Sequence, residues 1–161
     1  MVGSPWQSLD NIVEDIMYIE QFRPHMIGLG PFVPQHDTPL GKFDTGSADI
    51  TCRLYSIFRL IFPNALIPST TALNTIVANG RTRGIMAGAN VVMPNLSPAS
   101  ARANYTLYDG KAISNAEAAE GVAQLESQLA TIGYHINWNR GDFNQFTGNK
   151  RTSLQEDKRT S

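Results

Sequence analysis

The chain has 161 residues, of which 42% are hydrophobic and 17% charged, a composition typical of one globular domain rather than of a disordered chain. Its net charge of -1 gives no reason to expect a nucleic acid or an anionic membrane as partner, and no apolar run approaches the roughly 20 residues that span a bilayer. The single cysteine, Cys52, excludes an internal disulfide and an all-cysteine metal site within this chain, and it favours the reducing cytoplasm.

The first half of the chain predicts two helices on either side of a strand. Ser8 is the expected N-cap of the first helix, which apolar residues at helical spacing continue to just before Pro24. Residues 25–33, HMIGLGPFV, predict a buried strand, and its two glycines indicate close approach by a ligand or another backbone. Ser47 is the expected cap of the second helix, which Pro63 ends.

The second half continues the alternation of helices and strands. Three elements are predicted in its first part: a strand at 65–73, a short helix at 80–89 and a buried strand at 89–94. Pro68 is unfavourable inside the first of these strands. A long helix is expected to begin at Ser114, which has capping-box spacing to Glu117, and to end at the C′ glycine Gly133. Residues 139–161 are polar and predict a frayed tail.

Alternation of this kind predicts the α/β class, with right-handed βαβ units around a parallel sheet. Residues 1–3, MVG, are predicted to be the last residues of one more parallel strand. A sheet of three or four strands would have two open edges, at residues 1–3 and 89–94. Open edges favour pairing with another copy of the chain or with a missing part of the protein.

Ligands of parallel α/β folds meet the loops that follow the carboxyl ends of the strands, which here are residues 3–7, 30–40, 68–75 and 93–98. These loops are rich in proline, glycine, hydroxyls and amides. None contains a Ser/His/Asp or Cys/His set, a metal-ligand spacing, or a GxGxxG or Walker pattern. The residues alone therefore predict a polar rim at the strand ends but no reaction.

Two pairs of loop residues have both a functional and a structural interpretation. His36 and Asp37 have the chemistry of an acid/base pair, but adjacent loop residues of these types usually build a turn. Thr70 and Thr71 have hydroxyls suited to a substrate carboxylate or phosphate, but threonine is also favoured in strands.

The remaining candidates are equally open. Met93 either contacts an apolar ligand or ends a buried strand as a core residue. Arg102, Tyr105 and Tyr108 lie three residues apart, which places them on one helical face that either packs or binds. Cys52 is most simply a small core residue of its helix.

Five segments, in chain order, carry a resemblance to a known family: MVGSPWQSLDNIVEDI, HMIGLGPFVPQHDTPL, IPSTTALNTIVANGR, GANVVMPNLSP and YTLYDGK. Over residues 1–138 they resemble the C-terminal half of the HydE-type radical S-adenosylmethionine enzymes, which mature [FeFe]-hydrogenase. Biotin synthase and methylornithine synthase belong to the same wider group. The resemblance implies a (βα)8 barrel, of which this chain would form the end of strand five to strand eight.

The resemblance also implies cofactors that the complete enzyme would bind, namely S-adenosylmethionine and a [4Fe-4S] cluster held by a CxxxCxxC loop after strand one. This chain has only Cys52, so we expect it to hold no cofactor alone, to contain no catalytic or metal-binding residue, and to be inactive without the missing N-terminal half-barrel. The complete enzyme would generate a 5′-deoxyadenosyl radical that attacks a small substrate, in hydrogenase maturation an iron carbonyl-cyanide precursor. The alternatives are biotin-synthase-like or methylornithine-synthase-like chemistry, or a non-catalytic half-barrel that binds or assembles.

Site residues follow from the resemblance position by position. It assigns to the S-adenosylmethionine pocket Gly3, Ser4, Pro5, Gly30, Pro31, Phe32, Tyr105 and Tyr108. It assigns to the substrate cavity Thr70, Thr71, Met93, Asn95 and Arg102. The family's loop histidine stands one position earlier, where this chain has Gln35, which argues against a catalytic role of His36.

Overall fold

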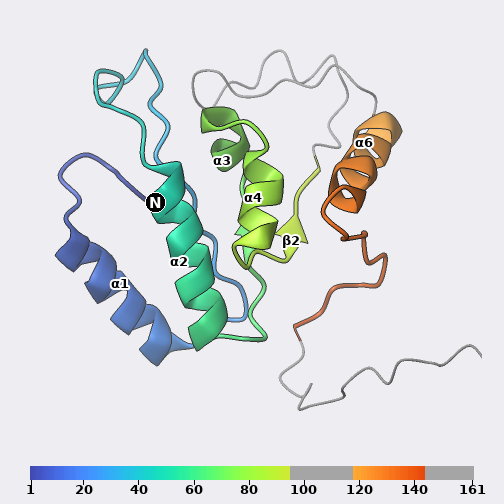
Figure 1. The fold of residues 1–161 in the computed structure, drawn as a ribbon. Helices are drawn as coiled ribbons and strands as arrows, with labels where there is room; N and C mark the ends of the chain where they lie inside the picture. The colour runs from blue at the N-terminus through green and yellow to red at the C-terminus, as the bar shows by residue number, and fades with distance from the viewer. Residues whose placement is uncertain (95–117, 144–161) are drawn as a thin grey trace, which may run out of the picture.

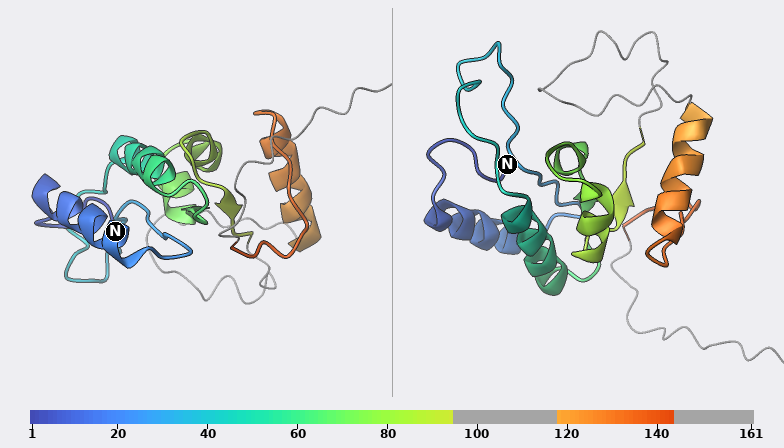
Figure 2. Two further views of the ribbon diagram at one scale, coloured as in Figure 1. Left: turned by 90° about the horizontal axis from the view of Figure 1, so that it is seen from below. Right: turned by 45° about the horizontal axis from the view of Figure 1, so that its top comes forward.

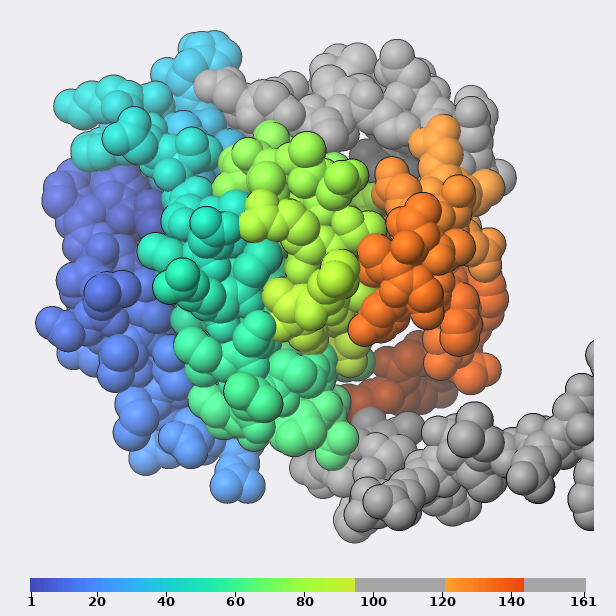
Figure 3. All heavy atoms as spheres, in the orientation of Figure 1, coloured from blue at the N-terminus to red at the C-terminus, as the bar shows by residue number. Residues whose placement is uncertain are grey.

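The computed structural model describes residues 1–94 and 118–143. Its elements in chain order are α1 (Leu9–Phe22), α2 (Ala48–Ile61), β1 (Pro68–Ser69), α3 (Thr71–Ile76), α4 (Gly80–Met86), β2 (Val91–Val92) and α6 (Ala118–Ala130). Helices α1, α2, α4 and α6 stand side by side in this order (Figure 1). Figure 2 shows the row from two further directions, with the extended segments on one side of it, and Figure 3 shows that the helices cover the face turned to the viewer.

The first two helices begin where the sequence predicts, because each has a local cap. Ser8 and Asn11 form a reciprocal capping box: the Asn11 backbone N–H donates to Ser8 Oγ at 3.2 Å, and the Ser8 N–H donates to Asn11 Oδ1 at 3.0 Å. Ser47 Oγ accepts from the Ile50 N–H at 3.2 Å and caps α2. The helices expected between Ser8 and Pro24 and between Ser47 and Pro63 are confirmed, as α1 and α2.

The extended segments pair in parallel, each with its successor along the chain. Val2 pairs with Pro31, Met26 pairs with Leu66, and β1 pairs with β2. Pro68 is tolerated in β1 because its neighbour Ile67 accepts the ladder hydrogen bond from the Val91 N–H at 3.2 Å. Parallel pairing through successive βα units is therefore confirmed, and the chain has an α/β fold.

Two predicted strands are shorter than the sequence suggested. The predicted strand 25–33 pairs only through the single bridges of Met26 and Pro31, and Pro31 has no N–H to extend the ladder. The prediction for 65–73 is wrong after Ser69, since Thr70 is the N-cap residue and α3 begins at Thr71. A cluster of hydroxyl residues favours a helix start as readily as a strand, and here the helix prevails.

The later elements agree with the sequence where the structure describes them. The short helix predicted at 80–89 is α4, and the strand predicted at 89–94 contains β2. α6 ends at Ala130 and a turn leads to Gly133, whose φ of 77° suits a glycine. Ser114, Glu117 and the tail from residue 144 lie outside the described residues.

The sheet buries one face against the helices. Ile27 and Leu29 are buried with Tyr55 and Phe58 of α2, whereas Met26 and Gly28, which alternate with them, are exposed. The helices therefore cover one face of the extended segments, and within residues 1–94 and 118–143 the other face is open at Met26 and Gly28. No helix in these ranges is long and apolar enough to cross a membrane.

The edge at residues 1–3 carries a side chain rather than a further strand. Val2 pairs with Pro31 on one side, and among the described residues no strand pairs with its other side. The Gly3 N–H donates to Gln7 Oε1 at 2.7 Å, and Gln7 Nε2 donates to the Met1 carbonyl at 3.1 Å. The backbone groups at this edge are therefore bonded by the Gln7 side chain.

Candidate functional site

The carboxyl ends of three parallel segments lie side by side and form what we call the strand-end rim: Gly3, Gly30–Phe32 and Ser69–Thr70. Hydrogen bonds join the first two segments, from the Val2 N–H to the Gly30 carbonyl at 2.9 Å and from the Phe32 N–H to the Val2 carbonyl at 2.8 Å. The Gly46 N–H also donates to the Phe32 carbonyl, at 2.8 Å, and ties the following loop to the rim.

Gly30 and Thr70 are in contact across the rim. A methyl group on Gly30 would lie 2.6 Å from Thr70 Oγ1, so that only glycine leaves room for the threonine side chain. The sequence predicts close approach by a ligand or another backbone at this strand, whereas the group that approaches Gly30 is the side chain of Thr70. Gly28 has a different environment, since a methyl group there would meet no atom within 4 Å and would point into open space.

The Thr70 hydroxyl is the polar atom that stands out in the rim. Thr70 Oγ1 is buried and makes no hydrogen bond of good geometry with the described residues, although the Thr70 side chain lies close enough to the Tyr55 hydroxyl to oppose the rise of the Tyr55 pKa. A buried hydroxyl without a partner destabilises a fold by about 1–3 kcal/mol, so such an atom usually has a water molecule, an ion or a ligand to satisfy it. A ligand with a carboxylate, hydroxyl or amine near Gly30 would fit this position.

Tyr55 fixes the rim from beneath, and the sequence analysis missed it. This fully buried side chain of α2 donates from its hydroxyl to the Leu29 carbonyl at 3.0 Å, and the hydroxyl oxygen accepts from the Thr70 N–H at 3.4 Å. Burial raises the pKa of Tyr55 and keeps the hydroxyl neutral. The available signal was a hydroxyl within the apolar stripe of a predicted helix, because a buried tyrosine needs a partner.

The two residues beside Thr70 have structural roles in this fold. Ser69 is buried and its Oγ donates to the Arg81 carbonyl at 3.0 Å, while Gly84 lets α4 approach it closely. Thr71 is the first residue of α3, and its carbonyl accepts from Thr75 Oγ1 at 3.1 Å. The structure therefore brings Thr70 rather than Thr71 to Gly30.

The other predicted pocket residues are only partly grouped. Gly3 has a φ of 75° and packs against the backbone of Gly46, and the half-buried Ser4 and Pro5 continue from it into a turn. Pro31 and Phe32 are buried in the rim, whereas Met93 is exposed after β2. Four further candidates lie outside the described residues: Asn95, Arg102, Tyr105 and Tyr108.

The His36–Asp37 pair lies in an exposed loop. His36 Nε2 is 3.1 Å from Asp37 Oδ2, and both side chains are more than half exposed. The neighbouring Thr38 bonds the Gln35 carbonyl through both its N–H and its Oγ1, which is the geometry of a tight turn. These contacts favour the interpretation of the pair as a turn device.

Metal ligands do not gather in the part of the chain that the structure describes, where no group of three or more His, Cys, Asp or Glu side chains converges. Cys52 is a free, half-buried thiol of α2. Burial raises its pKa, so it is protonated at neutral pH.

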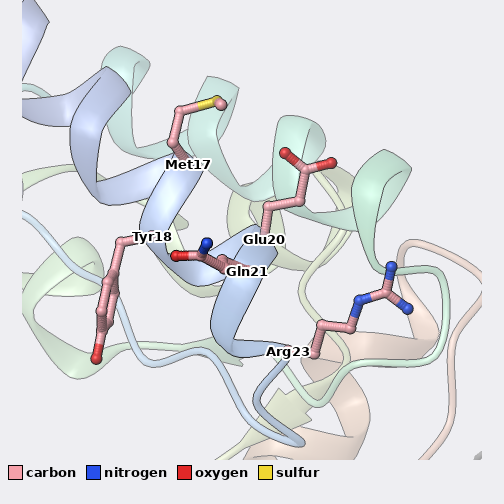
Figure 4. A pocket seen from close by; sticks show the side chains of 5 residues that line it. All are labelled: Met17, Tyr18, Glu20, Gln21 and Arg23. Carbon is pink, nitrogen blue, oxygen red and sulfur yellow. The ribbon is translucent and has the colours of Figure 1, made fainter.

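Two hollows lie away from the rim. One of about 670 Å³ is formed on the C-terminal half of α1 by Met17, Tyr18, Glu20, Gln21 and Arg23 (Figure 4). Another of about 570 Å³ lies at the amino ends of the same parallel segments, where Met26, Leu66 and Val91 meet residues 134–137. Neither hollow is lined by Gly30 or Thr70.

The comparisons with known proteins agree with this architecture. No family model matches the chain. It is 41% identical to the [FeFe] hydrogenase maturase subunit HydE of Thermotoga maritima over 111 residues, which are 69% of this chain and 32% of that protein. It is 32% identical to the 3-methylornithine synthase of Methanosarcina acetivorans over 100 residues, and 36% identical to that of Methanosarcina barkeri over 86 residues.

The match to the Methanosarcina acetivorans synthase covers 60% of this chain and 28% of the synthase, and the match to the Methanosarcina barkeri synthase covers 53% and 24%. With HydE included, the chain spans about a third or less of the length of these relatives. HydE and 3-methylornithine synthase are both radical S-adenosylmethionine enzymes. The chain is therefore a HydE-like homologue of one part of the radical S-adenosylmethionine enzymes.

Proposed function

We propose that residues 1–138 correspond to the C-terminal half-barrel of a HydE-like radical S-adenosylmethionine enzyme, and that the strand-end rim forms part of the wall of its S-adenosylmethionine and substrate cavity. One observation carries this proposal: the buried, unpaired hydroxyl of Thr70 lies against Gly30 at the carboxyl ends of parallel strands. In parallel α/β folds this is the end at which ligands bind.

The arrangement of the described elements supports a half-barrel. The parallel segments follow each other in chain order, and the helices lie on one side of them. The opposite face carries Gly28, where an added methyl group would meet no atom within 4 Å, and the half-exposed Met26. A barrel wall has this division between an outer helical layer and an inner face that lines the cavity.

The rim residues would bind and orient rather than react. Thr70 Oγ1 would hydrogen-bond a polar group of the ligand, Gly30 would leave room for the Thr70 side chain, and Tyr55 would hold the two segments in register. When bound to a reduced [4Fe-4S] cluster, S-adenosylmethionine supplies the radical chemistry of this enzyme class. The buried rim would exclude water from the reacting groups.

The cluster ligands would come from a part of the protein other than this chain. Cys52 is the one cysteine of the sequence and lies half-buried in α2, so it does not supply the three thiolates of such a cluster. We therefore propose that activity requires the remaining half-barrel. A free thiol suits a reducing compartment, and we propose the cytoplasm.

Maturation of the [FeFe]-hydrogenase active site is the activity favoured by the comparisons, since identity is higher to HydE than to the two methylornithine synthases. The methylornithine synthases remain the basis of a second candidate, the formation of 3-methylornithine. Both candidates use the same rim, and they differ in the substrate that the cavity would accept.

The experiment that tests the proposal is a Thr70→Val substitution in a chimera, in which this chain replaces the matching segment of Thermotoga maritima HydE. Valine has nearly the shape of threonine but lacks the unpaired hydroxyl, so the variant should be as stable as the parent or more stable. Its affinity for S-adenosylmethionine should fall about tenfold, because one hydrogen bond to a charged group contributes roughly 1.5 kcal/mol.

The matched control is Thr82→Val, since Thr82 Oγ1 donates to the Asn79 carbonyl on α4 and does not belong to the rim. Isothermal titration with S-adenosylmethionine measures both variants. Equal affinity of the parent and Thr70→Val would contradict a ligand contact at this hydroxyl.

A further inference from the structure

The segment that follows α6 turns back beneath the amino ends of the parallel strands. Residues 134–143, which we call the strap, contribute to the lining of the hollow of about 570 Å³ at these ends. The lining of this amino-end hollow also includes one residue from each parallel segment, namely Met26, Leu66 and Val91. Figure 1 shows the strap leaving α6 and passing below β2. The strap therefore helps to enclose the end of the strands that is opposite the strand-end rim.

The hydrogen bonds and ion pairs of the strap are internal. In the part of the chain that the structure describes, no hydrogen bond joins residues 135–143 to a helix or a strand. The Asn139 N–H donates to Asn137 Oδ1 at 3.0 Å, within the strap. The ion pair of Arg140 and Asp142, with 3.3 Å between Nε and Oδ1, also lies within it and is exposed. The position of the strap therefore depends on the packing of its side chains.

Two half-buried side chains, Ile136 and Phe143, attach the strap to the rest of the fold. Ile136 packs against the hydrophobic core. The Phe143 ring stacks on the ring of His25, with the centroids 4.3 Å apart and 13° between the planes, and it borders a hollow of about 270 Å³ at the ends of α1 and α2. Residues 137–142, between these two side chains, are all exposed. The strap is thus held at its two ends and not along its length.

The contact at Phe143 is the weaker attachment, because it ends the strap and breaks without the loss of a backbone hydrogen bond. A stacked aromatic pair at a protein surface contributes little, and a segment held by packing alone opens at a low free energy compared with a hydrogen-bonded strand. Gly141 turns the chain just before Phe143 with a φ of 71°, a conformation that suits glycine. This turn directs the ring back toward His25.

We propose that the strap is a cover of the amino-end hollow that can open, and that the stacking of Phe143 on His25 is the contact that holds it closed. Loss of this contact moves residues 137–143 away from the strands and opens the hollow to solvent at the end opposite the strand-end rim. The inference does not rest on the proposed function, since it uses contacts within this chain and Phe143 lies outside residues 1–138, which carry the family resemblance.

The test measures how fast a thiol inside the hollow is alkylated in the intact chain. Ala89 lines the hollow and is 4% exposed, so Ala89→Cys places a thiol there, and Cys52→Ala removes the natural one. In this background Phe143→Ala should raise the rate of alkylation by iodoacetamide about tenfold, because loss of the stacked pair raises the population of the open strap. Circular dichroism verifies that each variant is folded.

Three further variants show whether the stacking is the cause. Phe143→Leu keeps an apolar side chain but loses the ring, so it should raise the rate by about threefold. His25→Ala should act like Phe143→Ala, and the double variant should react no faster than the faster single variant, because both substitutions remove one contact. Trp138→Ala is the matched control: this strap residue is 71% exposed and stacks on no ring among the described residues, so the rate should not change.

Fluorescence anisotropy gives a second readout that needs no introduced cysteine. Trp6→Phe leaves Trp138, in the middle of the strap, as the one tryptophan of the chain. Phe143→Ala should lower the anisotropy of Trp138, because the strap then moves independently of the fold. Phe43→Ala, which removes the ring beside residue 6 and not that beside His25, is the control and should leave the anisotropy unchanged.

Three results would overturn the inference. The first is an equal rate of alkylation in the parent and in Phe143→Ala, with equal anisotropy of Trp138. The second is a parent thiol that reacts as fast as the thiol of the urea-unfolded chain, which would mean that the strap does not cover the hollow. The third is an effect of Trp138→Ala on alkylation as large as that of Phe143→Ala.

Discussion

Substitution of Tyr55 by phenylalanine removes one oxygen atom from the centre of the fold and leaves the ring in place. The Tyr55 hydroxyl is fully buried and serves two backbone groups, the Leu29 carbonyl at 3.0 Å and the Thr70 N–H at 3.4 Å. Both groups belong to the segments that meet in the strand-end rim. The variant therefore tests whether this hydroxyl holds the rim together.

The expected loss of stability follows from the partners that remain. The bond to Leu29 is short and its loss leaves a buried carbonyl without this donor, which destabilises by about 1–3 kcal/mol. The contact with Thr70 is at the long limit of a hydrogen bond and adds little. We expect Tyr55→Phe to lower the free energy of unfolding by about 2 kcal/mol and the Tm by roughly 4–8 °C.

Urea denaturation followed by circular dichroism measures this change in the chain and in a matched control. Tyr18→Phe is the control, because Tyr18 is exposed on α1 and its ring stacks on Phe22, a contact that phenylalanine retains. The control should lie within about 0.5 kcal/mol of the parent. If Tyr55→Phe is as stable as Tyr18→Phe, the Tyr55 hydroxyl does not fix the rim.

Two further predictions use the same denaturation assay. Gly30→Ala should destabilise the fold by about 2 kcal/mol, because its methyl group would press on Thr70 Oγ1. Gly28→Ala should be neutral or slightly stabilising, because no atom lies near its methyl group. Equal effects of the two substitutions would refute the close contact between Gly30 and Thr70. The part of the stability that is linked to Tyr55 should be complete below about pH 10 and should fall as the pH rises through the raised pKa of Tyr55, because the unfolded chain releases that proton first. The comparison is made in a Cys52→Ala background, because burial also raises the pKa of that thiol. In this background Tyr55→Phe should lose the decrease in stability that is linked to Tyr55. An unchanged dependence of stability on pH would contradict this prediction.

Local signals allowed the helices to be predicted, and long-range contacts explain what was missed. Ser8 and Ser47 cap their helices through residues three positions away, so the sequence contains the whole motif. Residues 70–73 carry signals for both a strand and a helix start, and the packing of α3 against α4 accompanies the helical choice. A single sequence does not show that packing.

The candidate site could be predicted in part. The glycine at position 30 indicated a close approach, and the structure shows that Thr70 makes it. The link from Tyr55 to Leu29 joins residues 26 positions apart and has no sequence pattern. The bonds of Gln7 to Gly3 and Met1 join residues that are close in the sequence. They could still not be predicted, because a glutamine in a turn has the same sequence pattern whether or not its side chain bonds a strand.

The most direct test of the account is the release of 5′-deoxyadenosine by the chimera in which this chain replaces the matching segment of Thermotoga maritima HydE. The cluster is reconstituted under anaerobic conditions, its content is verified from the iron and the absorbance, and product is measured after reduction in the presence of S-adenosylmethionine. If the rim forms part of the cavity of a HydE-like enzyme, the chimera should release 5′-deoxyadenosine, and Thr70→Val should release less at limiting S-adenosylmethionine. A folded chimera with a complete cluster that releases none would contradict the account.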